Sequence, residues 1–148
     1  SIIESMGIEL NKEDKQRPGE SLFTVANGPP DMSRIIFSEY HAAGSITASY
    51  MIRKNKYKYI YYVGYKPELY DLENDPEELN DISEKPESQK ILIEYEKILR
   101  EILDPEKTDK AAKKDQRELV ESYGGREEIL KRGGINTTPA PGKKAKFT

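Results

Sequence analysis

Few residues in this chain have side chains that could carry out hydrolytic or transfer chemistry. The sequence contains no cysteine and a single histidine, His41. No serine lies in a Gly-x-Ser-x-Gly turn, and no glycine-rich loop leads into a helix. A hydrolase needs a nucleophile or an activated water, a base and a polarising group that converge on one pocket. We therefore predict no catalytic residues in this chain, and the lack of cysteine also excludes disulfides and thiolate zinc sites.

An acidic run between Asp71 and Glu78 is the main candidate for a cation site. Hard cations such as Ca²⁺ bind clustered carboxylates, and this run superficially resembles a calcium loop. It lacks the glycine at the sharp turn and the terminal bidentate glutamate at the required spacing. We interpret the carboxylates as solvated turn residues, with Asp75 capping residues 76–78, and we predict no metal site.

Lysines and tyrosines are mixed along residues 54–66, as they are on surfaces that bind single-stranded RNA. The formal net charge is −3, from 24 basic and 27 acidic side chains, so there is no long-range field to attract nucleic acid. An amphipathic strand with half-buried tyrosines and solvated lysines gives the same pattern. We favour that interpretation and predict no nucleic-acid partner.

His41 is the one candidate binding residue. It follows Ser38, Glu39 and Tyr40 at the end of a predicted strand, just before residues 42–44. A histidine at such a place is usually a structural hydrogen-bonding residue, although loops at strand ends also host binding residues. Both interpretations stay open on the sequence alone.

The elements that would position His41 are strands. Residues 57–63 place tyrosine and valine on alternate positions, and the two preceding segments are rich in β-forming residues. Asn55-Lys56 separates two of these segments, and asparagine tolerates the left-handed conformation of a tight hairpin. The predicted strands cover residues 34–40, 48–54, 57–63 and 68–72.

Helices precede and follow the predicted sheet. Residues 1–10 read as the end of a helix and residues 107–123 as a helix with a thinner apolar stripe, which includes Leu119 and Tyr123. Residues 136–148 show no apolar period and are predicted to be a docking or mobile tail. The clearest helix covers residues 86–103 and carries an apolar stripe of Leu92, Tyr95, Leu99, Ile102 and Leu103.

The predicted fold class is α+β: a four-stranded antiparallel sheet with one long helix on a face, plus C-terminal helices and a tail. Only 35% of the residues are apolar and 34% are charged, so we expect a small core with polar ends. The predicted division is an N-terminal segment (1–33), a sheet-plus-helix core (34–103) and a helical extension with the tail (104–148). No apolar run approaches the ~20 residues that span a bilayer, so no membrane partner is predicted.

The order of several motifs resembles the C-terminal part of the sulfatase family, within the alkaline phosphatase superfamily. The most specific piece is Glu-Leu-Tyr-Asp-Leu at 68–72 followed by Asp-Pro-Glu-Glu-Leu-Asn at 75–80. Residues 19–22 are similar to the family's Gly-Arg-Ser-Leu segment, with Glu20 in place of the arginine. The series also includes residues 37–41, 51–53 and 57–60, and the resemblance covers nearly the whole chain.

The resemblance implies that the parent enzyme is a sulfuric ester hydrolase. In such enzymes a formylglycine made within a Cys/Ser-x-Pro-x-Arg motif is catalytic, and a divalent cation, usually calcium, is held upstream. This chain has neither, so the resemblance implies a missing N-terminal catalytic domain as its partner and no activity alone. It also implies that this domain lines one side of the substrate cleft, with His41 near the cleft mouth as a substrate-binding residue.

Two other functions remain open at this point. The parent enzyme could be a related phosphonate or phosphate ester hydrolase, because the C-terminal sheet is shared more widely than the sulfate chemistry. Alternatively, the chain is a free-standing module that binds protein or RNA. A sheet covered by one helix leaves a second apolar face, which a homo-oligomer could also bury. The sequence does not identify the compartment; a parent enzyme of this family would be periplasmic or secreted.

Overall fold

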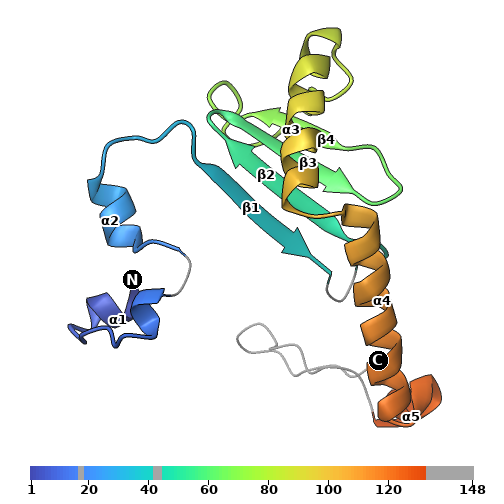
Figure 1. The fold of residues 1–148 in the computed structure, drawn as a ribbon. Helices are drawn as coiled ribbons and strands as arrows, with labels where there is room; N and C mark the ends of the chain where they lie inside the picture. The colour runs from blue at the N-terminus through green and yellow to red at the C-terminus, as the bar shows by residue number, and fades with distance from the viewer. Residues whose placement is uncertain (17–18, 42–44, 133–148) are drawn as a thin grey trace, which may run out of the picture. The chain divides into compact units, whose positions relative to one another are not determined.

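The computed structural model describes residues 1–16, 19–41 and 45–132, and the chain forms two compact units that divide after Arg34 (Figure 1). The N-terminal unit contains α1 (Ile2–Ser5), a 3₁₀ turn (Asp14–Gln16) and α2 (Leu22–Asn27). Neither α-helix of this unit has a buried residue. The helix predicted for residues 1–10 ends early, and Gly7 follows it with φ +66°.

The second unit is built on a four-stranded antiparallel sheet, as predicted. Its strands are β1 (Ile35–Tyr40), β2 (Ser49–Lys54), β3 (Tyr57–Tyr62) and β4 (Glu68–Asp71), and neighbours in sequence are neighbours in the sheet. Asn55 has φ 52°, so the predicted left-handed residue does turn β2 into β3. The register pairs Ile52 with Tyr59, and Tyr59 with Leu69.

One face of the sheet carries the core. Because side chains alternate between faces, Tyr50, Ile52, Tyr59 and Leu69 all point to the same side, and each is at most 1% exposed. Helix α3 (Gln89–Ile102) crosses this face, as Figure 1 shows. The helix contributes Tyr95, Ile98 and Leu99 to the buried cluster.

The predicted apolar stripe of α3 is right except at its end. Ile102 is 46% exposed, and Ile98 takes a buried place that the stripe did not include. The reason is that α3 ends at Ile102 and the chain turns into an extended conformation at Leu103, which packs on the core instead. A 3₁₀ turn (Pro86–Ser88) precedes α3, as expected for proline in a first turn.

Two further helices follow: α4 (Pro105–Ser122) and α5 (Gly125–Arg132). Helix α4 begins before the predicted residue 107, because Pro105 starts the first turn and Asp104 accepts a hydrogen bond from the Lys107 amide at 2.9 Å. Leu119 and Tyr123 of the predicted stripe are exposed. The predicted tail, 136–148, lies outside the described residues. Among the described helices none is both long and apolar enough to cross a bilayer.

We expect Leu99→Ala to lower the free energy of unfolding by about 2–5 kcal/mol, because Leu99 is fully buried between α3 and the sheet. Ile93→Ala is the matched control on the same helix, since Ile93 is 70% exposed and should cost less than about 0.5 kcal/mol. Chemical denaturation of both variants measures the difference. Equal effects at the two positions would show that the buried face of α3 is assigned incorrectly.

Candidate functional site

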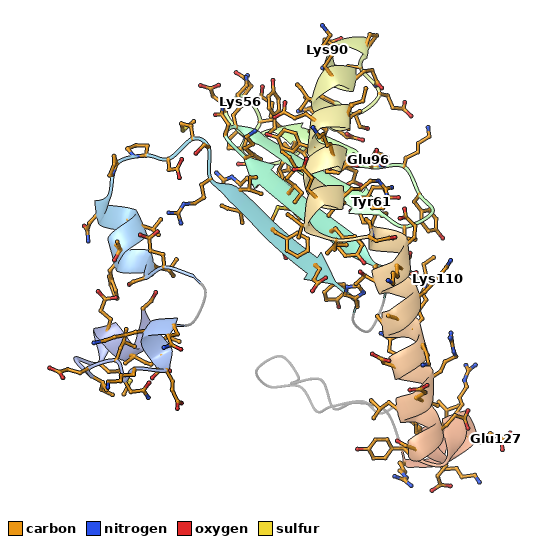
Figure 2. The ribbon with its side chains drawn as sticks, in the orientation of Figure 1. Lys56, Tyr61, Lys90, Glu96, Lys110 and Glu127 are labelled. Atoms are coloured by element: carbon orange, nitrogen blue, oxygen red, sulfur yellow. The ribbon has the colours of Figure 1, made fainter. Side chains whose placement is uncertain are left out.

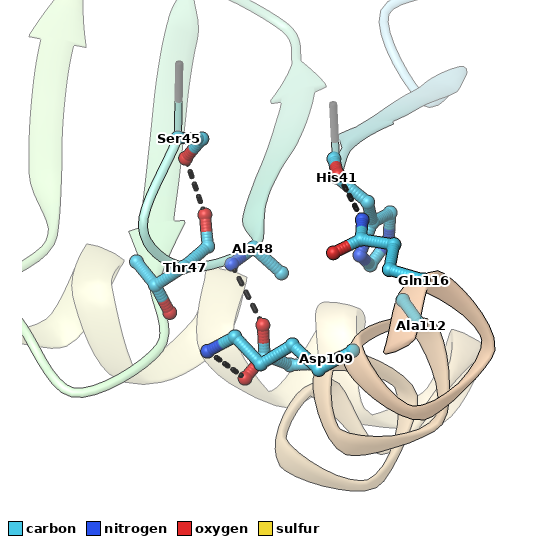
Figure 3. A pocket seen from close by; sticks show the side chains of 8 residues that line it. His41, Ser45, Thr47, Ala48, Asp109, Ala112 and Gln116 are labelled. Carbon is cyan, nitrogen blue, oxygen red and sulfur yellow. Dashed lines mark hydrogen bonds and ion pairs between the residues drawn. The ribbon is translucent and has the colours of Figure 1, made fainter. Parts of the chain in front are cut away.

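The candidate site lies where β1 ends and β2 begins, against the part of α4 between Asp109 and Gln116. A small cavity of about 20 Å³ lies at this place and has room for about one water molecule. Figure 3 shows the side chains that line it. Its lining residues come from the ends of the two strands and from one face of α4: His41, Ser45, Thr47, Ala48, Asp109, Ala112, Lys113 and Gln116.

The imidazole of His41 is held on several sides. Its Nε2 lies 3.3 Å from Oε2 of Glu39, and its ring meets the Tyr50 ring edge-on with the centroids 5.5 Å apart. The side chain is 21% exposed, while Nδ1 is buried and has no hydrogen-bond partner among the described residues. Gln116 donates a hydrogen bond of 2.7 Å from Nε2 to the backbone carbonyl of His41. The ring therefore keeps one unused polar atom inside an otherwise packed environment.

Asp109 is a buried ionisable residue beside the partly exposed His41. It is 5% exposed; Oδ1 accepts from the Ala48 amide at 2.9 Å and Oδ2 accepts from Lys113 Nζ at 2.8 Å. Burial raises the pKa of Asp109, but the hydrogen bonds from Lys113 and the Ala48 amide outweigh it and hold the pKa below its ordinary value. The carboxylate is thus charged at neutral pH and ties α4 to the start of β2.

The junction of α3 and α4 is fixed by a charged cluster. Arg100 binds the Glu106 carboxylate through two nitrogens, at 3.0 and 3.1 Å, and Tyr61 donates to the same carboxylate at 2.5 Å. Tyr61 lies at the end of the sheet nearest this junction (Figure 2). The hydrogen bonds from Arg100 and Tyr61 lower the pKa of Glu106 from 4.5 to about 2. This cluster links the first turn of α4 to α3 and β3.

The acidic run at Asp71 and Asp75 forms turns, as predicted. Asp75 accepts from the amides of Leu79 and Asn80 at 3.1 and 2.8 Å, which are the two residues that follow the predicted capping positions 76–78. Asp71 accepts from Lys56 at 2.8 Å, and this hydrogen bond is the main cause of its lowered pKa. No group of three His, Asp or Glu side chains in the described parts of the chain is arranged to hold a metal ion.

The strand that mixes lysine and tyrosine is amphipathic, as we interpreted it. Tyr59 is buried under α3, whereas the lysines pair with carboxylates outside the core. Lys54 binds Glu94 at 2.9 Å and Lys58 binds Glu78 at 2.5 Å. These lysines neutralise neighbouring acids.

Fold and contacts together define a class: an α+β domain whose ionisable side chains near the candidate site mainly hold its own elements together. The model of the family described as "N-sulphoglucosamine sulphohydrolase, C-terminal" matches residues 2–105, well over half of the chain. The chain belongs to this family, and the resemblance to sulfatase C-terminal domains is confirmed.

Individual sulfatases show the same similarity. The choline-sulfatase of Rhizobium meliloti (strain 1021) is 33% identical over 86 residues, which cover 58% of this chain and 17% of that protein. Arylsulfatase K of Gallus gallus is 39% identical over 72 residues, covering 46% of this chain and 13% of the relative. A crystal structure assigned to a sulfatase of Bacteroides thetaiotaomicron VPI-5482 gives a TM-score of 0.51 at 30% identity, over 68% of this chain and 22% of that one. The chain therefore spans less than a quarter of the length of each of these proteins.

Sequence reasoning singled out His41 but missed Asp109 and Gln116. The spacing of Asp109, Ala112, Lys113 and Gln116 follows the i, i+3, i+4, i+7 pattern of one helix face, so their common orientation could have been found. Their partners could not, because Ala48 and His41 lie far away in the sequence. Only the packing of α4 on the sheet brings these residues together.

The Glu106 cluster predicts a specific dependence of stability on pH. Because the pKa of Glu106 is lower in the folded state, its contribution is present above about pH 4.5 and is lost as the pH falls toward 2. The carboxylate is 41% exposed, so after solvent screening we expect Glu106→Gln to cost at most about 1 kcal/mol at pH 6. Urea denaturation from pH 7 to 2.5 should show the two proteins converging at the acid end.

The control for this experiment is Glu101→Gln. Glu101 lies at the end of α3, close in sequence to Glu106 at the start of α4, but its contact is a single exposed pair with Lys97 at 3.8 Å. Its effect on unfolding should be smaller than that of Glu106→Gln at pH 6. A stability difference for Glu106→Gln that stays constant across the whole pH range would contradict the cluster's assigned role.

Proposed function

We propose that this domain serves a sulfuric ester hydrolase, in which it packs against an N-terminal catalytic domain and lines one side of the substrate cleft. The observation that carries the proposal is the family match over residues 2–105, in agreement with the predicted and observed fold. The similar proteins described above are sulfatases that are several times longer than this chain. The activity would therefore belong to the whole protein and require residues outside this domain.

The open face of the sheet is where the catalytic domain would pack. Within the described part of residues 35–132, no helix covers the side opposite α3, and its apolar residues are half-buried or exposed. Ile36 is 43% exposed, and Met51 pairs with Ile60 across β2 and β3 on this same face. Arg53, Lys58 and Glu68 lie on this face among the apolar residues, so it is a mixed surface of the kind that partner domains cover. As an alternative to packing against the catalytic domain, we propose that two copies of this chain associate through the same face and form a homo-oligomer.

The family's formylglycine and calcium would lie in that catalytic domain. The sequence has no cysteine and no Cys/Ser-x-Pro-x-Arg motif, and the described residues offer no ligand group for a cation. The sequence therefore does not fit formylglycine, and the residues that the structure describes do not fit calcium. What the domain would supply is shape, packing and contacts to the part of the substrate that faces it.

His41 is the residue that we propose for such a contact. It lies at a strand end and keeps 21% of its side chain exposed. Its unused Nδ1 is buried, so a hydrogen bond to substrate would come from Nε2, which lies 3.3 Å from Glu39 Oε2. The adjoining cavity of about 20 Å³ is too small for a sulfate group, so contact with substrate would involve the exposed edge of the ring. The contact with Glu39 equally supports a purely structural role, and the experiments below separate the two.

The purified 148-residue chain should show no sulfatase or phosphatase turnover, with or without added calcium. The reason is that its sequence lacks the formylglycine motif and its described residues lack a cation site. Assays with aryl sulfate and aryl phosphate esters check this expectation. Turnover that survives repurification and follows this chain through chromatography would refute it.

In the full-length protein that carries this domain, His41→Ala should lower kcat/KM roughly ten- to hundredfold, the effect of losing a hydrogen bond to a charged group. Thermal unfolding must be measured in parallel, because the variant also loses the ring contact with Tyr50. Lys110→Ala, which removes an exposed side chain of α4, is the control and should leave kcat/KM unchanged. If activity is unaltered, or falls only as far as stability does, His41 is structural.

A further inference from the structure

We propose that α4 acts as a clamp on the β1–β2 connection, and that Asp109 and Gln116 are the positioning residues which fix the imidazole of His41. The link to substrate rests on the function proposed for His41, whereas the clamp itself can be tested without it. Asp109 and Gln116 lie beyond residue 105, where the family match ends. The clamp is therefore carried by the part of the chain outside the matched region.

The two hydrogen bonds hold opposite ends of the same connection. Gln116 donates to the backbone carbonyl of His41, the residue after β1, at 2.7 Å. Asp109 accepts from the backbone amide of Ala48, the residue before β2, at 2.9 Å. Asp109 and Gln116 are seven residues apart, which is about two helical turns, so one face of α4 presents both (Figure 3). One helix thus contacts both ends of the connection, which the pairing of Tyr40 with Ser49 keeps side by side.

A hydrogen bond from the sheet also holds the start of α4. Tyr50, whose ring supports the His41 imidazole, donates from its hydroxyl to the carbonyl of Pro105 at 3.0 Å. Pro105 is the first residue of α4. The helix therefore holds His41 through its main chain and, through Tyr50, also holds the surface on which the ring packs.

The hydrogen bond of Asp109 is buried and charged, whereas that of Gln116 is exposed and neutral. Asp109 and Ala48 are 5% and 1% exposed, so losing this acceptor would leave a buried amide without a partner. Gln116 is exposed, and its bond is neutral. Ala112 lies between them on the helix and lines the cavity, where its small side chain leaves room beside the ring. Gln116 can therefore be changed with less risk to the fold than Asp109.

The alternative is that Glu39 and Tyr50 hold His41 by themselves and α4 only covers the end of the sheet. These interpretations predict different behaviour of the ring when α4 is altered. Because His41 is the only histidine in the sequence, its ring carbon-bound protons can be observed by NMR without ambiguous assignment. This readout reports the ring environment directly and needs no catalytic activity.

The test compares the His41 ring resonances in the 148-residue chain and in the variants Gln116→Ala, Asp109→Ala and Asp109→Asn, with Lys110→Ala as the control. We expect Gln116→Ala and Asp109→Ala to shift or broaden these resonances beyond the change in Lys110→Ala. Asp109→Asn keeps an oxygen for the Ala48 amide and should restore most of the parent spectrum. If Asp109→Ala does not fold, the comparison rests on Gln116→Ala. Parent-like resonances in a folded Gln116→Ala variant would overturn the clamp.

Activity of the full-length protein then separates the clamp from the substrate role. We expect Gln116→Ala to lower kcat/KM roughly two- to tenfold, as for loss of one neutral hydrogen bond, and to have no further effect when His41→Ala is already present. If Gln116→Ala changes the His41 ring resonances but His41→Ala does not lower kcat/KM, the substrate role of His41 is refuted and the clamp is supported. Additive losses from the two substitutions would overturn positioning through His41.

Discussion

The interaction on which this fold depends is the burial of a tyrosine-rich sheet face under α3. Tyr50, Tyr59 and Tyr95 provide much of the volume of the buried cluster, and Leu69 and Leu99 fill the space between them. Aromatic rings bury large areas and also carry a polar end that needs a partner. In a chain with only 35% apolar residues, this gives a core of sufficient size while placing hydroxyl groups at its rim.

Those hydroxyl groups connect the core to the elements around it. Tyr95 donates to the carbonyl of Lys54 at 2.5 Å, which ties α3 to the end of β2, and Tyr50 donates to the carbonyl of Pro105 at 3.0 Å. Burial raises the pKa of both tyrosines to about 12, so they remain donors throughout the physiological range. The placement of α4, and with it the surroundings of His41, is thus a consequence of how the sheet face is packed.

The strands and the clearest helix could be predicted because their signals are local. Alternation marks β3, Asn55 supplies the hairpin turn, and the apolar spacing around Tyr95 and Leu99 marks α3. The exposure of Ile102 could not be predicted, since it depends on α3 ending there and on Leu103 packing on the core in an extended conformation. The contacts of Asp109 and Gln116 were also beyond reach, because they join α4 to strand ends that lie 61 and 75 residues earlier.

The contacts of this domain are consistent with a role in packing and substrate contact, with catalysis carried out by another domain. Around His41, one carboxylate is used to hold a backbone amide and another lies against the imidazole, so the described residues do not converge on a reacting group. The open sheet face, in contrast, keeps apolar residues such as Ile36 in solvent, which is unfavourable unless another surface covers it. A domain that uses its carboxylates near His41 to hold its own elements together, and leaves apolar residues of its sheet in solvent, is suited to dock on a partner. In a sulfatase, that docking would bring the clamped end of the sheet, rather than new catalytic groups, to the edge of the cleft.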